Sequence, residues 1–294
     1  MPTVFANGIE LDYDTFGSAE HPALLLIMGF SVQKIAWDEA FCQLLADQGF
    51  FVIRFDNRDV GLSTKIANAP EPDLGAAFAG DFSSAAYQLE DMADDAAGLL
   101  DALGIPDAHI VGASMGGMIA QTLAIHHPDK VRSLCSIMST TGSPSVGQPN
   151  PEAIGALLNP PPETREQALD RAVEVSRVIG SPGYPFDEPA VRERAGRAWD
   201  RNHDPKGIVR QLLAIMAQPD RTKPLGQLRT PTLVIHGGAD PLINPSGAQA
   251  TAAAIPDARL LIISGMGHDL PVEVWPQVVD AIVDNTARAS TAAA

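Results

Sequence analysis

The clearest indication of the fold of this chain is the segment His109-Ile110-Val111-Gly112-Ala113-Ser114-Met115-Gly116-Gly117. Its apolar start predicts a buried strand, and residues 112–116 match G-x-S-x-G, the nucleophile elbow. That motif needs a sharp turn from strand to helix, which lifts a serine hydroxyl clear of the backbone at the end of a sheet. Small residues on both sides let the strand and the helix approach closely and relieve the strained serine. The motif occurs once in the chain, and we therefore predict that Ser114 is a nucleophile.

Short apolar runs on both sides of the elbow predict a parallel sheet. Ala23–Ile27 is a continuous apolar run too short for a helix, which is typical of a strand buried on both faces. At the start of the chain, Asn7-Gly8 favours a type I′ turn between two hairpin strands. Strands alternate with helices, and this alternation predicts a mostly parallel sheet covered on both faces. The eight predicted strands are 3–6, 9–13, 23–27, 51–55, 109–111, 131–138, 232–236 and 259–263.

Glycines and capping residues mark the ends of the predicted helices. A helix over about 37–47 is expected to end at Gly49. A longer helix is expected to start at Ser83 or Ser84, since serine is a common N-cap, and to close at Gly104. The other core helices are expected from the elbow to about residue 127, over 246–254 and over 272–287.

Residues 139–225 differ from the rest of the chain. They hold many prolines and helical stretches near 164–178, 188–201 and 206–216, and no convincing strand. An irregular surface loop of that length would be too long for a compact domain. We therefore predict a helical cap inserted between two parts of one core, 1–138 and 226–294. The final residues 286–294, rich in Ala, Ser and Thr, are expected to fray.

Composition narrows the class of protein. A chain of 294 residues suits one large α/β domain with an insertion, and 36 acidic against 20 basic residues give a formal net charge of −16. So acidic a surface repels nucleic acid and anionic lipid headgroups. Cys42 and Cys135 are expected to be small core residues rather than a disulfide, and no spacing suggests a metal site. No signal peptide or membrane span is visible, so the predicted compartment is the cytoplasm.

A serine hydroxyl needs a base, and a base needs a carboxylate to orient it. Of the seven histidines, His268 alone lies in a glycine-rich loop that follows a strand at the edge where the elbow lies. Asp240 follows another strand at the same edge, which gives the order Ser, Asp, His. Asp269 is close enough in the sequence to be the orienting carboxylate instead, but the side chains of adjacent loop residues rarely point at each other. The alternatives are a surface histidine at 268 and an aspartate at 240 that caps the following turn.

Four segments of this chain resemble the α/β-hydrolase superfamily: residues 27–30, residues 55–63, the elbow, and the loops of Asp240 and His268. Met-Gly at 28–29, Ser-Met-Gly at 114–116 and Gly-Met-Gly-His at 265–268 are most similar to the branch of aclacinomycin methylesterase and related bacterial carboxylesterases. The resemblance implies the α/β-hydrolase fold and ester hydrolysis without a metal or an organic cofactor.

By this resemblance the backbone amides of Phe30 and Met115 form the oxyanion hole. The sequence departs from the commoner His-Gly-x-Pro pattern, with Met28 and Ser31 in place of His and Pro, so what supports the loop stays open. Arg58 and Asp59 are expected to form a structural, non-catalytic pair that braces the loops around the site. The predicted substrate-pocket residues are Gly29, Met266, Leu270, Tyr184, Phe186 and Trp199. For the three aromatic residues of the predicted cap, Tyr184, Phe186 and Trp199, packing in the core remains an alternative to lining the pocket.

The predicted reaction is a two-step acyl transfer on a small-molecule ester, with Ser114 as nucleophile and His268 as base. The same triad also serves carbon–carbon bond hydrolysis, thioester or lactone hydrolysis and perhydrolysis, which differ in the shape of the pocket. A non-catalytic ligand-binding protein on the same fold is a further alternative. The sequence predicts neither the natural substrate nor the number of subunits.

Overall fold

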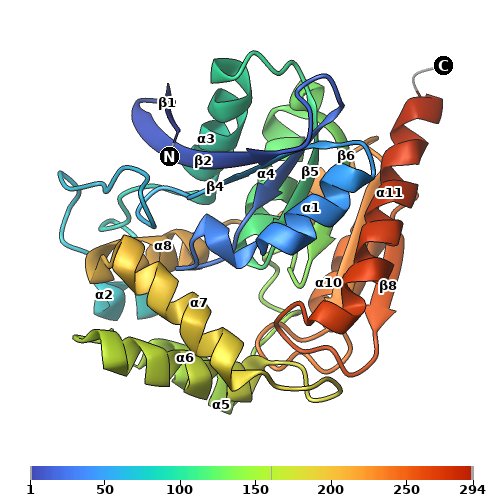
Figure 1. Ribbon diagram of the computed structural model, residues 1–294. Helices are drawn as coiled ribbons and strands as arrows, with labels where there is room; N and C mark the ends of the chain where they lie inside the picture. The colour runs from blue at the N-terminus through green and yellow to red at the C-terminus, as the bar shows by residue number, and fades with distance from the viewer. Residues whose placement is uncertain (1, 160, 293–294) are drawn as a thin grey trace.

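A computed structural model describes residues 2–159 and 161–292 and contains one eight-stranded sheet (Figure 1). The strand order is β1-β2-β4-β3-β5-β6-β7-β8. The β1–β2 and β2–β4 pairs are antiparallel and all the others are parallel, which confirms the predicted sheet. The strands are β1 Thr3–Ala6, β2 Ile9–Phe16, β3 Ala23–Ile27, β4 Phe51–Phe55, β5 Ala108–Ala113, β6 Val131–Ile137, β7 Thr232–Gly237 and β8 Arg259–Ile263.

Helices cover both faces of the sheet. Trp37, Phe41 and Val278 lie in the apolar core between the sheet and helices α1 and α11, while Met92 and Ile119 lie in the core beneath α3 and α4. Figure 1 shows α1 and α11 in front of the sheet. The helices outside the cap are η1 Lys34–Ala36, α1 Glu39–Asp47, α2 Leu74–Phe78, α3 Leu89–Ala102, α4 Met115–His126, η2 Pro128–Lys130, α10 Ser246–Ala254, η3 Val272–Val274 and α11 Trp275–Ala292.

The local predictions hold at the hairpin and fail at the start of helix α3. Asn7 and Gly8 both have positive φ, 48° and 80°, as a type I′ turn requires. Helix α3 begins at Leu89, so the predicted start at Ser83 or Ser84 is wrong: Gln88 is the N-cap. Ser84 instead accepts a hydrogen bond from the amide of Asp73 at 3.1 Å, which holds it in the preceding loop.

The end of the described chain also differs from the prediction. Residues 286–294 were expected to fray, but helix α11 continues to Ala292. Asn285 helps to hold this helix on the sheet, because its side-chain amide donates to the carbonyl of Leu134 at 3.0 Å. Residues 293 and 294 lie outside the described residues.

Residues 139–225, called the cap below, contain five helices and no strand among the residues that the structure describes there. They lie between β6 and β7 in the chain, and Figure 1 shows α5–α8 gathered at one end of the sheet. Short α5 and α9 were not predicted; α5 begins where the side chain of Asn150 accepts a hydrogen bond from the amide of Ala153 at 2.7 Å. The cap helices are α5 Pro151–Leu158, α6 Arg165–Ile179, α7 Glu188–Arg201, α8 Pro205–Met216 and α9 Thr222–Leu225.

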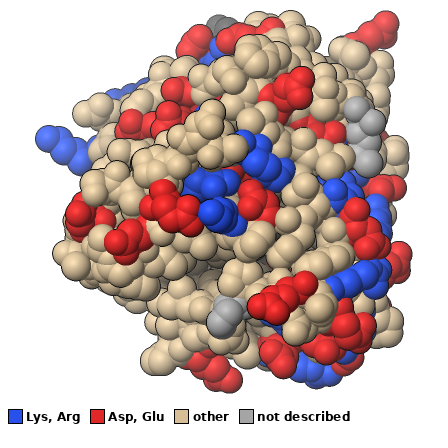
Figure 2. Space-filling model, turned by 90° about the vertical axis from the view of Figure 1, so that its left-hand side faces the viewer, with Lys and Arg blue, Asp and Glu red and all other residues tan. Residues whose placement is uncertain are grey.

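Two further predictions can be compared with the structure. Cys42 and Cys135 are both buried and unpaired, as predicted. No helix within 2–159 and 161–292 combines the length and the apolar character needed to cross a bilayer. On the face in Figure 2, acidic and basic side chains are intermixed. The cytoplasmic location and the lack of a nucleic-acid partner stay predictions.

Candidate active site

Ser114 lies at the turn between strand β5 and helix α4. Its φ is 57° and its ψ −121°, a conformation that L-residues avoid. Two glycines make the turn possible: a Cβ at Gly112 would lie 2.0 Å from the carbonyl oxygen of Gly116, and one at Gly116 would lie 2.1 Å from that of Ile27. The elbow therefore has the strained, closely packed geometry that the motif predicts.

The three residues predicted as a triad are joined by hydrogen bonds. The Nε2 atom of His268 lies 3.0 Å from the Oγ atom of Ser114, and its Nδ1 atom lies 2.8 Å from the Oδ2 atom of Asp240. The other carboxylate oxygen of Asp240 accepts from the amides of Leu242 and Ile243, both at 2.9 Å. Asp240 thus both caps its turn and binds the imidazole.

The rival carboxylate, Asp269, has a different partner. It accepts a hydrogen bond from the hydroxyl of Ser181 in the cap. Asp240, rather than Asp269, binds the Nδ1 atom of His268 in this structure.

The surroundings of Asp240 favour its charged form. Burial alone would raise the pKa of this carboxyl group, but His268, a hydrogen bond from His236 and the amide of Ile243 hold the pKa well below its ordinary value. The Nε2 atom of His236 lies 3.3 Å from the carboxylate and 2.7 Å from the carbonyl oxygen of Ile243. A carbonyl only accepts, so this nitrogen carries the hydrogen. Asp240 therefore lies between two imidazoles. The sequence predicted only one of them, His268, as its partner.

The cap holds the loop that carries His268. The amide of His268 donates to the carbonyl of Ile179 at 2.7 Å, and the amide of Gly267 donates to the hydroxyl of Ser181 at 2.8 Å. The backbones approach so closely that a Cβ at Gly267 would lie 2.2 Å from the carbonyl oxygen of Gly180. The position of His268 thus depends on the cap.

The loop after β3 lies directly against the serine. A Cβ at Gly29 would lie 3.0 Å from the Cβ of Ser114. The side-chain amide of Asn57 donates to the carbonyl of Met28 at 2.9 Å, and the amide of Ser31 donates to the side chain of Gln211 at 2.8 Å. These two side chains hold the loop at opposite ends. They support it in this chain, which lacks the His and Pro of the commoner pattern.

Arg58 and Asp59 brace the loop after β4, as expected, but each does so with a partner of its own and not as a pair. Arg58 binds Asp95 of helix α3 at 2.6 Å, whereas Asp59 binds Arg210 of helix α8 at 2.7 Å. Tyr87 also donates to Asp59 at 2.7 Å. The two neighbours therefore tie the same loop to the core and to the cap.

The predicted pocket residues have different environments. Met266 is fully buried in the core, with Leu270 and Tyr184 packed against the same cluster, and the Tyr184 hydroxyl donates to the carbonyl of Ser264 at 3.2 Å. Phe186, which is 39% exposed, lies under the guanidinium of Arg177. Trp199 stacks on His203 with ring centroids 4.2 Å apart. Gly29 lies so near Ser114 that a Cβ added to it would lie 3.0 Å from the Cβ of the serine.

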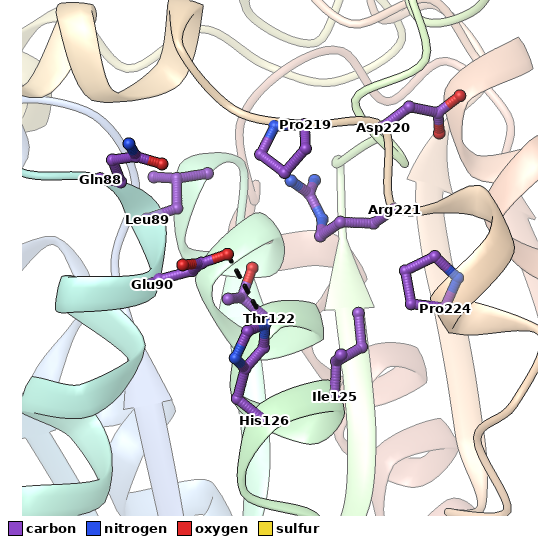
Figure 3. Close-up of a pocket in the computed structure, with 10 residues that line it drawn as sticks. All are labelled: Gln88, Leu89, Glu90, Thr122, Ile125, His126, Pro219, Asp220, Arg221 and Pro224. Carbon is purple, nitrogen blue, oxygen red and sulfur yellow. Dashed lines mark ion pairs between the residues drawn. The ribbon is translucent and has the colours of Figure 1, made fainter.

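A separate cavity of about 200 Å³ lies towards the other end of helix α4 (Figure 3). Glu90 and His126 face each other across part of it, 3.7 Å apart. Its lining includes Thr122 and Arg221 but no member of the triad. Among the described residues, no group of three or more His, Cys, Asp or Glu side chains could hold a metal ion.

A protein-family model described as the alpha/beta hydrolase fold matches residues 22–273. The chain belongs to this family. Rhodomycin D methylesterase DauP from Streptomyces sp. (strain C5) is 32% identical over 99% of this chain and 100% of its own length. Rhodomycin D methylesterase DnrP from Streptomyces peucetius is 31% identical with the same coverage. The predicted family and methylesterase-like branch are confirmed, and both names agree with the predicted ester hydrolase.

Solved structures of this α/β-hydrolase family share the fold along almost the whole chain. The enol-lactonase from Burkholderia xenovorans LB400 superposes with a TM-score of 0.75 at 25% identity, and covers 97% of this chain and 100% of its own. A thermophilic esterase from Thermogutta terrifontis reaches 0.72 at 25% identity, with 98% of each chain covered.

Sequence reasoning missed four supporting residues: Asn57, Ser181, Gln211 and His236. Asn57 lies within the motif of residues 55–63, and His236 ends a predicted strand four residues before Asp240. Both therefore lie beside residues that the sequence had already indicated. Ser181 and Gln211 lie in the cap, more than 80 residues from the loop that either contacts. Only the folded arrangement brings them there.

Proposed function

We propose that this α/β hydrolase is a serine carboxylesterase whose nucleophile, base and orienting acid are Ser114, His268 and Asp240. The observation that carries the proposal is the position of His268, with one ring nitrogen 3.0 Å from the serine hydroxyl and the other 2.8 Å from the carboxylate. An Nδ1–H donated to Asp240 leaves the Nε2 lone pair facing the serine, which is the tautomer that a general base needs.

The reaction has two steps. The Oγ atom of Ser114 attacks the ester carbonyl carbon while its proton moves to Nε2 of His268. His268 then gives that proton to the leaving alcohol, and an acyl group remains on Ser114. Water then gives a proton to His268 and attacks the acyl carbon, the bond from that carbon to Oγ of Ser114 breaks, and His268 returns the proton to Oγ as the carboxylic acid leaves.

The negative oxygen formed in each step needs donors, which we assign to the amides of Phe30 and Met115. The Met115 amide is the first of helix α4, and amides of a first turn have no acceptor within their helix. Phe30 follows Gly29, at which an added Cβ would lie 3.0 Å from the Cβ of Ser114. Within the described chain neither amide donates to another residue, so both are available to an oxyanion.

The proposed substrates are methyl esters of carboxylic acids, which would release methanol. This rests on two full-length relatives named methylesterases, at 32% and 31% identity. We further propose that residues 139–225 act as a cap over the site of a core formed by 1–138 and 226–294. The support is that cap residues bind both the loop of His268 and the loop of Phe30.

The test is hydrolysis of carboxylic methyl esters, together with p-nitrophenyl esters from acetate to laurate, by the wild type and by Ser114→Ala. We expect turnover by the wild type and a loss of at least about 10⁴-fold in the variant. Equal rates for the two proteins would refute the assigned nucleophile. Turnover of lactones or carbon–carbon substrates, with all open-chain esters left intact, would instead support one of the other reactions that this triad serves.

A further inference from the structure

Gln211 is a fully buried amide in helix α8 of the cap that bonds to two loops of the core. Its Oε1 atom accepts from the amide of Ser31 at 2.8 Å, and its Nε2 atom donates to the carbonyl of Arg58 at 2.8 Å. One partner can only donate and the other can only accept, so a single orientation of the side-chain amide satisfies both. The side chain therefore links the loop after β3 to the loop after β4.

The loop after β3 needs such a restraint. Ser31 has a φ of 58°, a left-handed conformation that non-glycine residues adopt only where their surroundings enforce it. Asn57 holds the carbonyl of Met28 at one end, and Gln211 holds the amide of Ser31 at the other. Phe30, whose amide we assign to the oxyanion hole, lies between these two points.

We infer that Gln211 is a positioning residue for the oxyanion hole, through which the docked cap holds the Phe30 amide towards Ser114. This inference rests on the proposed function. Donors to an oxyanion stabilise the transition state only when they already point at the place where charge develops. Without Gln211, the strained Ser31 is free to relax and to carry the neighbouring Gly29–Phe30 peptide with it.

A role in stability alone predicts a different pattern of effects. Gln211 would then act only by fixing helix α8, and any variant that loosens this helix equally would lower activity equally. Leu213 provides this comparison, because it is also fully buried on α8 but lies about 200° around the helix from Gln211. Its side chain has no hydrogen bond to lose.

The experiment compares wild type, Gln211→Met and Leu213→Ala, well below their melting temperatures. Two quantities are measured: kcat and KM for a p-nitrophenyl ester, and the rate at which a fluorophosphonate labels Ser114. In the labelling reaction the serine Oγ–P bond forms, fluoride leaves and the serine proton passes to His268. Methionine keeps the length of the side chain and removes both hydrogen bonds. We expect Gln211→Met to lower kcat and the labelling rate by about 10- to 100-fold, with KM changed by less than about twofold.

Leu213→Ala should lower the melting temperature and leave both rates within about twofold of wild type. Gln211→Glu, which keeps an oxygen facing the Ser31 amide, should recover part of the kcat lost in Gln211→Met. Wild-type rates in Gln211→Met, or an equal loss in Leu213→Ala, would overturn the positioning role and leave the esterase intact. A wild type that neither hydrolyses an ester nor is labelled at Ser114 would overturn the proposed function and this inference together.

Discussion

Asp240 is a buried carboxylate with donors on both of its oxygens. Two backbone amides bind one oxygen, and His268 and His236 lie within 3.3 Å of the other. Charge-assisted hydrogen bonds of this kind compensate for the cost of burying a charge. The result is an ionised side chain that holds His268 with its basic nitrogen towards Ser114.

Asp240→Asn tests the orienting role. The new amide can still accept from Leu242 and Ile243, but its NH₂ group would then face His268 and favour the wrong imidazole tautomer. We expect kcat to fall by about 10⁴-fold, the size of effect known when a triad aspartate is replaced by asparagine. Ester hydrolysis by the purified variant measures it, and a loss below tenfold would argue against the assigned role.

The same substitution predicts how stability depends on pH. The pKa of Asp240 lies below its ordinary value of 3.8 in the folded protein. Its charge therefore stabilises the fold fully above about pH 4, and this contribution is lost as the pH falls further. In urea titrations, wild type should be more stable than Asp240→Asn at pH 7, and the gap should narrow from pH 4 to pH 3. A difference in stability between the two proteins that does not change with pH would contradict the lowered pKa of Asp240.

Helix α4 can approach the sheet closely because two elbow positions, Gly112 and Gly116, are glycines, and a Cβ at either would clash with the backbone. At Gly116 a Cβ would meet the backbone of Ile27, which cannot move aside as a flexible side chain could. Gly155 in helix α5 is a matched contrast, because no atom lies within 4 Å of the Cβ that an alanine would add there.

We therefore expect Gly116→Ala to destabilise the fold by about 1–3 kcal/mol through overpacking. Gly155→Ala should stabilise it by about 0.5–1 kcal/mol, because alanine is the better helix former. Urea midpoints of the two variants and the wild type give the comparison. Equal midpoints for all three would show that the close approach at the elbow is not required.

The elements that could be predicted from the sequence are those whose signals are local. The elbow, the Asn7-Gly8 turn and the helix end at Gly104 each depend on residues a few positions apart, and each is found as predicted. The start of helix α3 was misplaced because Ser83 and Ser84 resemble N-caps. Nothing nearby in the sequence shows that Ser84 binds Asp73 instead.

Buried ion pairs join the cap to the core across the whole molecule. Arg201 of helix α7 binds Asp12 at 2.8 Å and Asp56 at 2.9 Å, and fully buried Lys34 also binds Asp12. The sequence could predict that Ser114, Asp240 and His268 lie together, because parallel strands end at one edge of the sheet. It could not find Arg201 or Gln211, since the contacts of these two residues with the core span more than 140 residues and follow no local pattern.

Arg201→Met should be strongly destabilising because it leaves two buried carboxylates short of a partner. We expect a loss of about 3–5 kcal/mol in the free energy of unfolding. Arg165→Met is the matched control: Arg165 pairs with Asp200 at the surface, where both side chains are at least half exposed, and little change is expected. Similar losses in the two variants would show that burial does not set the strength of these pairs.

The proposed reaction forms an acyl-enzyme on Ser114, and mass spectrometry can detect this intermediate directly. The protein is mixed with a p-nitrophenyl ester, quenched in acid during turnover and digested. We predict that the peptide containing Ser114 gains the mass of the acyl group in the wild type, and that Ser114→Ala shows no adduct. An adduct on another residue, or turnover of Ser114→Ala at the wild-type rate, would show that Ser114 is not the nucleophile.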